Sequence, residues 1–177
     1  MLKLQVLEAL TEIPFPRNEN LCTRYATEII LRRGPINNLT IGVIPHAARS
    51  PDKQARIKGF KETITDFKQL PDVMEKGMEV MGIASGSSSS SSANAFARDV
   101  LSIEIEGPTR PQLTLVDNPG LIRTATGNVT DSDIDLVAQI TQHYISNPRT
   151  ICLAVVAASA DYATQEILKK VLKENEL

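Results

Sequence analysis

The second half of the chain alternates strand patterns with helix patterns, and this alternation limits the folds open to it. Apolar residues occupy every second position over Leu101–Ile105, which is typical of a half-exposed strand. Leu113–Val116 and Thr150–Ala157 are also predicted strands, and the second is apolar throughout, as expected of a parallel strand covered on both faces. A helical pattern that begins near Ser132 separates them. Strands that alternate with helices predict an α/β fold.

The first half of the chain adds strands of opposite direction. Ala26–Arg32 and Leu39–Ile44 have strand patterns, and Gly34-Pro35 between them has turn chemistry, so we predict a hairpin. The remaining helical patterns cover Leu4–Thr11, Ser50–Leu70, Pro71–Ile83 and Thr164 to the end of the chain. Together these elements predict a sheet of mixed strand directions, flanked by helices.

A single domain is predicted, because 177 residues suit one hydrophobic core and the sequence shows no internal repeat. A run of six serines follows Gly86, and we expect residues 85–98 to form a flexible loop within the domain.

Composition excludes several classes of function. Aromatic residues are only 4% of the chain and the net charge is −2, so we expect no nucleic-acid partner. No apolar run approaches the ~20 residues that a membrane span needs, so we expect no membrane insertion. We interpret Cys22 and Cys152 as reduced thiols, which predicts a cytoplasmic protein.

Two segments carry residues suited to phosphate chemistry. Asp117 follows a predicted strand, where an acid can hold a magnesium ion, and Gly120 offers a bare N–H that can approach a phosphate closely. Thr23 precedes another strand, and its hydroxyl can reach a metal. The alternatives are a plain turn at Asp117–Gly120 and a surface threonine at position 23.

Several segments together resemble the GTPase domain of the dynamin superfamily, in the style of its fungal dynamin-like and Mx-like members. The matching segments are Val6–Leu10, Pro14–Arg17, Cys22–Arg24, Ile103–Pro108, Leu113–Leu121 and Arg149–Asp161. The resemblance implies a P-loop NTPase fold with a mixed, mostly parallel sheet. It also implies hydrolysis of GTP with Mg²⁺, coupled in the parent family to membrane remodelling.

The resemblance also implies roles for individual residues. Thr23 corresponds to the catalytic threonine that binds magnesium and positions the attacking water, and Asp117 to the aspartate of the magnesium shell. Gly120 corresponds to the glycine whose N–H meets the γ-phosphate. Lys3 falls on the nucleotide-binding lysine of the phosphate loop. The strand at Arg149–Ala157 corresponds to the one that precedes the guanine-reading segment.

The chain also departs from the family pattern. It contains no Gly-x-x-x-x-Gly-Lys-Ser/Thr and no Lys-x-Asp, the motifs for phosphate and guanine. Leu4 replaces the serine that would bind magnesium, and Asn118 replaces the usual leucine. We therefore expect residues 1–177 to be one incomplete GTPase domain, truncated at both ends, that lacks the first strand and the phosphate loop.

Whether the chain is an enzyme stays open at this point. The first interpretation is a fragment of a GTP hydrolase that binds GTP weakly or not at all by itself. The alternative is a degenerate, non-catalytic paralogue that binds related GTPase domains. Because the missing strand would leave bare edges, both interpretations predict self-association or binding to related domains.

Overall fold

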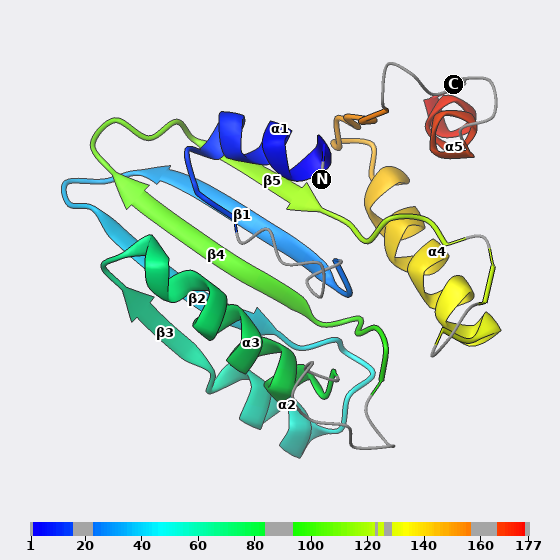
Figure 1. Ribbon diagram of the computed structural model, residues 1–177, viewed down its shortest axis with the longest axis horizontal. Helices are drawn as coiled ribbons and strands as arrows, with labels where there is room; N and C mark the ends of the chain where they lie inside the picture. Colours follow the sequence, from blue (N-terminus) through cyan, green and yellow to red (C-terminus); the bar gives the residue numbers. More distant parts are fainter. Residues whose placement is uncertain are drawn as a thin grey trace.

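The computed structural model describes residues 2–15, 23–83, 94–122, 124–125, 129–156 and 166–175, which include a mixed sheet flanked by helices (Figure 1). The strands are β1 Ala26–Arg33, β2 Asn38–Ile44, β3 Lys61–Ile64, β4 Val100–Gly107 and β5 Leu113–Asp117. The helices are α1 Leu2–Thr11, α2 Pro51–Lys58, α3 Leu70–Met81, α4 Asp131–Ile145 and α5 Glu166–Asn175, with a short 3-10 helix at Phe67–Gln69. The predicted α/β fold with a mixed sheet flanked by helices is confirmed.

β4 lies at the centre of the sheet, whose strand order is β3-β2-β4-β1-β5. It pairs with β1 in parallel and with β2 in antiparallel orientation. The predicted hairpin of β1 and β2 is therefore wrong, because β4 is inserted between the two strands. The expectation of a mostly parallel sheet is also wrong for the described strands, since β1 with β4 is the one parallel pair.

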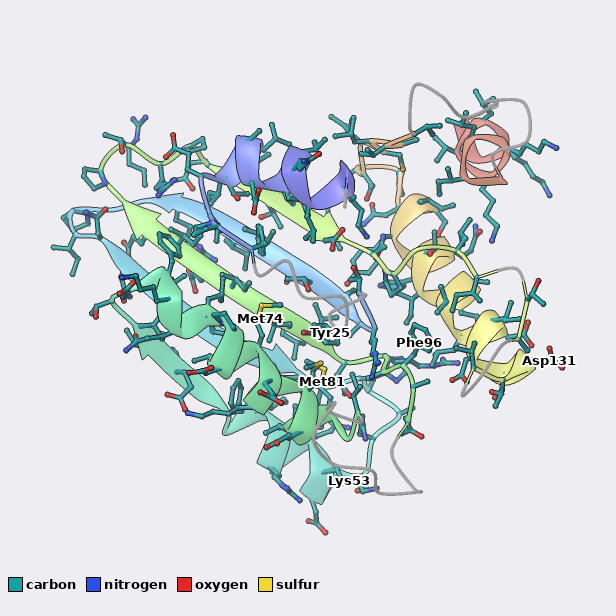
Figure 2. The ribbon with its side chains drawn as sticks, viewed as in Figure 1. Tyr25, Lys53, Met74, Met81, Phe96 and Asp131 are labelled. Atoms are coloured by element: carbon teal, nitrogen blue, oxygen red, sulfur yellow. The ribbon has the colours of Figure 1, made fainter. Side chains whose placement is uncertain are left out.

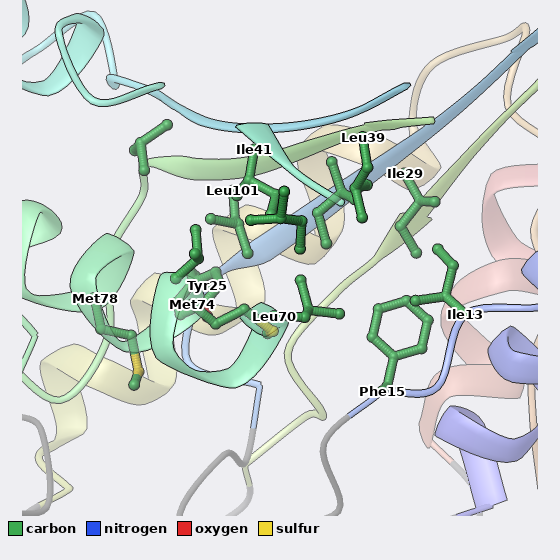
Figure 3. Packing of buried hydrophobic residues seen from close by; sticks show 14 of the residues in the cluster. Ile13, Phe15, Tyr25, Ile29, Leu39, Ile41, Leu70, Met74, Met78 and Leu101 are labelled. Carbon is green, nitrogen blue, oxygen red and sulfur yellow. The ribbon is translucent and has the colours of Figure 1, made fainter. Parts of the chain in front are cut away.

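One face of the sheet carries the hydrophobic core (Figure 3). α3 places Leu70, Val73, Met74 and Met78 against it, at the spacing of one helical face. α1 contributes Leu7 to the same cluster. The segment after α1 adds Ile13 and Phe15, and the central strands add Ile29, Ile41 and Ile103, all buried. The two helices and the central strands that they cover therefore share one core.

The helix predicted over Ser50–Leu70 is shorter than expected. α2 ends at Lys58, and the chain then pairs Lys61–Ile64 with β2 as an edge strand. Ile64 is 6% exposed and belongs to the core, so tertiary burial at the sheet edge outweighs helical propensity here. Ser50 precedes α2 but makes no side-chain cap hydrogen bond.

The predicted strand at Thr150–Ala157 is wrong for the residues that the structure describes. Residues 150–156 belong to no strand or helix, and Ile151 and Leu153 are 97% and 69% exposed. The apolar pattern predicts a strand that is buried between two neighbouring strands. Among the described strands, none lies beside residues 150–156.

The predicted helix near Ser132 is α4, which begins one residue earlier. Thr130 caps it: the Thr130 hydroxyl accepts from the Asp133 N–H, and the Asp133 carboxylate accepts from the Thr130 N–H. The serine run of the predicted flexible loop lies outside the described residues, although Ala97 at its far end is buried. None of the described helices combines the length and the apolar character needed to cross a bilayer.

The close approach of α3 to the sheet depends on Gly77. A Cβ at this position would lie 3.2 Å from Leu101 Cδ1 and 3.8 Å from Val43 Cγ2. Gly77→Val is expected to lower the free energy of unfolding by about 1–3 kcal/mol, because the added methyl groups overpack the interface. Glu75→Val is the matched control on the exposed side of α3, and chemical denaturation measures both. An equal loss in the two variants would contradict the packing argument.

Candidate functional site

The site begins with Asp117, the last residue of β5. Asp117 is paired with Thr27 of β1 and is 7% exposed. The chain then leaves the sheet through Asn118, Pro119 and Gly120. The end of β5 thus presents a largely buried carboxylate at the point where the backbone turns away. A buried carboxylate needs a compensating charge or hydrogen bonds.

Thr23 lies beside this carboxylate, although 94 residues separate it from Asp117 in sequence. β1 and β5 are antiparallel, so the start of β1 lies next to the end of β5. Thr23 is three residues upstream of β1, and its hydroxyl donates to Asp117 Oδ2 over 3.4 Å. This bond is long, so it constrains the Thr23 hydroxyl only weakly.

Lys3 of α1 completes the cluster. Its ammonium lies 2.9 Å from Asp117 Oδ1, donates to the Asn118 carbonyl over 2.6 Å, and donates to Thr23 Oγ1 over 3.4 Å. The three acceptors match the three hydrogens of an ammonium group. The structure therefore brings together three of the four predicted site residues, Lys3, Thr23 and Asp117, from separate segments.

The oxygens around Lys3 are ligands of the kind that Mg²⁺ prefers. They comprise a carboxylate, a hydroxyl and a backbone carbonyl. Only one is charged, and no cluster of three His, Cys, Asp or Glu side chains that could hold a metal occurs in the described part of the chain. The donor set therefore fits a magnesium ion that shares its coordination shell with phosphate oxygens, as Mg²⁺ commonly does in nucleotide sites.

Gly120, the fourth predicted residue, is exposed, and an added Cβ would meet no heavy atom within 4 Å. This open space is compatible with close approach of a ligand, and the role of its N–H stays a prediction. Asn118 is a contributor that sequence reasoning missed, since it acts on Lys3 through its backbone. Its side-chain Oδ1 is buried and has no hydrogen-bond partner among the described residues.

Tyr25, two residues after Thr23, is 3% exposed and belongs to the hydrophobic core. Burial raises the pKa of its phenol well above the usual range, Arg24 lowers it in part, and the Asp117 carboxylate raises it further. Tyr25 is therefore uncharged at neutral pH, and Lys3 supplies the compensating positive charge for Asp117. On α4, burial and the nearby Glu28 carboxylate raise the pKa of Tyr144 as well.

The chain is also similar to known proteins. The model of the dynamin family matches residues 3–176. The chain is 32% identical over 166 residues to an interferon-induced GTP-binding protein Mx of Dicentrarchus labrax, covering 94% of this chain and 22% of the relative. For the Mx protein of Gallus gallus the identity is 28% over 167 residues, covering 94% of this chain and 21% of the relative. For the Mx protein of Perca fluviatilis it is 30% over 167 residues, covering 94% and 49%.

The chain thus spans between about a fifth and a half of the length of these relatives. The likeness to Mx-like members is confirmed, and a fungal origin stays a prediction. Because the family model covers nearly every residue, this protein belongs to the dynamin family.

Proposed function

We propose that this chain carries the magnesium- and phosphate-contacting residues of a dynamin-like GTPase domain. The observation that supports the proposal is the convergence of Lys3, Thr23 and Asp117 within hydrogen-bonding distance. These residues come from α1, the segment before β1 and the end of β5. In the whole protein the activity would be hydrolysis of GTP, coupled to membrane remodelling in the cytoplasm, as the family resemblance implies.

Each residue has a distinct role in this proposal. Lys3 would turn from Asp117 to the phosphate oxygens of GTP, which carry more negative charge. Asp117 and Thr23 would then hold magnesium, and Thr23 would also orient the attacking water. The Gly120 N–H would donate to the γ-phosphate. Bound magnesium would neutralise phosphate charge, while the protein groups supply positioning, the main requirement of phosphoryl transfer.

The chain by itself would bind GTP weakly. The sequence contains no phosphate loop, whose backbone N–H groups cradle the phosphates. Each hydrogen bond to a charged phosphate contributes roughly 1.5–3 kcal/mol. Loss of about four such bonds costs on the order of 6 kcal/mol, or ~10⁴ in affinity, which changes micromolar binding to ~10 mM.

Calorimetric titration with Mg²⁺ and a non-hydrolysable GTP analogue is therefore expected to show no micromolar binding. At analogue concentrations of ~10 mM, the ¹³C-methyl resonance of Thr23 is expected to shift, because the ligand draws Lys3 away from the cluster. Asp117→Asn is expected to weaken this response, since it removes the carboxylate that would hold the metal. Asp131→Asn, at an exposed position on α4, is the matched control.

Two results would contradict this proposal in different ways. Tight magnesium-dependent binding would show that the affinity argument is wrong. A Thr23 resonance that does not respond to ~10 mM analogue, or that responds equally in Asp117→Asn, would remove the assignment of the site.

The alternative is a degenerate paralogue that binds related GTPase domains without catalysis. The retention of a lysine, a threonine and an aspartate in mutual contact favours the GTPase interpretation. Genomic DNA upstream of Met1 separates the two. An in-frame Gly-x-x-x-x-Gly-Lys-Ser there supports a GTPase fragment, and its absence supports the paralogue.

We also propose that the chain self-associates through the second edge of β5 and through exposed apolar side chains. β5 pairs only with β1 among the described strands, so its second edge has no strand partner there. Leu113 on this strand is 40% exposed. Ile151 and Leu153 are more exposed still, and their segment has a strand-like composition. Unpaired edges and exposed apolar side chains promote association between chains.

Ile151→Lys is expected to reduce association, because a charged ammonium opposes burial between chains. Sedimentation velocity over a range of concentrations measures the weight-average mass. Ile36→Lys is the matched control, since Ile36 is 67% exposed but lies in the connection from β1 to β2. The wild-type chain is expected to associate, and so is Ile36→Lys. A wild-type chain that stays monomeric at all concentrations would contradict the proposal.

A further inference from the structure

Asp99 is a buried charge outside the cluster described above. It directly precedes β4 and is 0% exposed. Its carboxylate accepts from the His46 N–H over 2.9 Å and from Arg49 Nε over 3.1 Å, and it forms an ion pair with Arg49 Nη2. A buried carboxylate is tolerated when it is paired and hydrogen-bonded in this way.

Arg49 joins three segments of the fold. Besides Asp99, its Nη2 donates to the carbonyl of Met81, the last residue of α3, over 2.7 Å. Its own carbonyl accepts from Gln54 of α2 over 2.8 Å. The planar guanidinium thus holds the loop after β2, the end of α3 and the start of β4 in one arrangement.

The segment that ends at Asp99 also reaches the candidate site. The Ala97 N–H donates to the carbonyl of Arg24, the neighbour of Thr23, over 3.0 Å. The next residue, Arg98, donates to Gln139 of α4 over 2.5 Å. In Figure 2 Phe96 lies on the side of Met81, the last residue of α3, that faces α4. Residues 97–99 therefore connect the buried ion pair with the backbone beside Thr23.

We propose that the Asp99–Arg49 pair is a positioning device for Thr23. The pair fixes the position of Asp99, and the short segment 97–99 links Asp99 to Ala97. The hydrogen bond from the Ala97 N–H to the Arg24 carbonyl then fixes the backbone next to Thr23. This support matters because the bond from Thr23 to Asp117 is 3.4 Å long and places the hydroxyl only loosely. The inference rests on the proposed role of Thr23 in the site.

The competing explanation is that the pair only stabilises the fold. A general loss of stability would affect amides throughout the core, whereas loss of positioning would be confined to the path through Ala97. The two explanations therefore differ in which residues respond, and the test does not require a nucleotide.

The experiment uses the full chain with Asp99→Asn and Arg49→Lys. Asp99→Asn keeps the shape and removes the charge. Arg49→Lys keeps the positive charge and removes the guanidinium group that reaches the Met81 carbonyl. It is the milder variant, for use if Asp99→Asn does not fold. NMR measures amide hydrogen exchange at Ala97, at Ile41 and at Ile103, together with the methyl resonance of Thr23.

We expect exchange at Ala97 to accelerate about tenfold or more, as in a local opening, and the Thr23 methyl resonance to move. The amides of Ile41 and Ile103, both in central strands, should change much less. Arg98→Ala is the matched control within the same segment, because it removes the hydrogen bond to Gln139 on α4 and should leave Thr23 in place.

Two outcomes would overturn the inference. Equal acceleration at all amides would mean that the pair acts on global stability alone. Faster exchange at Ala97 with an unchanged Thr23 resonance would mean that the segment moves without affecting the site. Either result is independent of GTP binding, so failure of the inference is distinct from failure of the proposed function.

Discussion

The antiparallel pairing of β1 with β5 is the interaction on which the site depends. It aligns Thr27 with Asp117, so the start of one strand lies beside the end of the other. Thr23 and Asp117 meet for this reason, despite their separation in sequence. A slip of one residue would turn Asp117 to the opposite face of the sheet and separate it from Lys3. The register is held by burial, because Ile29 and Leu31 of β1 face the core.

Local patterns predicted most elements of the fold but not the way in which they pair. The alternation at Leu101–Ile105 predicts a strand, and β4 is one. It could not predict that β4 separates β1 from β2, because the nearest-neighbour hairpin has the lower cost of loop closure and is the simpler expectation. The central place of β4 follows from burial: Leu101 and Ile103 are 0% exposed, a degree of burial that an edge strand rarely reaches.

The errors at Lys61–Ile64 and Thr150–Ala157 share a physical cause. In each case the state of the segment depends on a partner that a local pattern does not specify. Ile64 is buried because the edge of β2 is available to its strand. Ile151 is exposed because the described residues offer its segment no strand partner. Intrinsic preference is weaker than tertiary context in both segments, which is usual for short apolar runs.

The site residues were predicted from the resemblance to the dynamin superfamily, and two supporting contacts were not. Asn118 acts through its carbonyl, which every residue possesses, so its identity carries no signal. Asp99 and Arg49 read as ordinary charged residues, because nothing in their spacing indicates a buried pair.

The charge balance of the site explains why Lys3 takes the position that it does. Asp117 is nearly buried and requires a compensating charge, which the Lys3 ammonium supplies. In the proposed site a bound phosphate would attract the lysine and would supply further oxygens to magnesium.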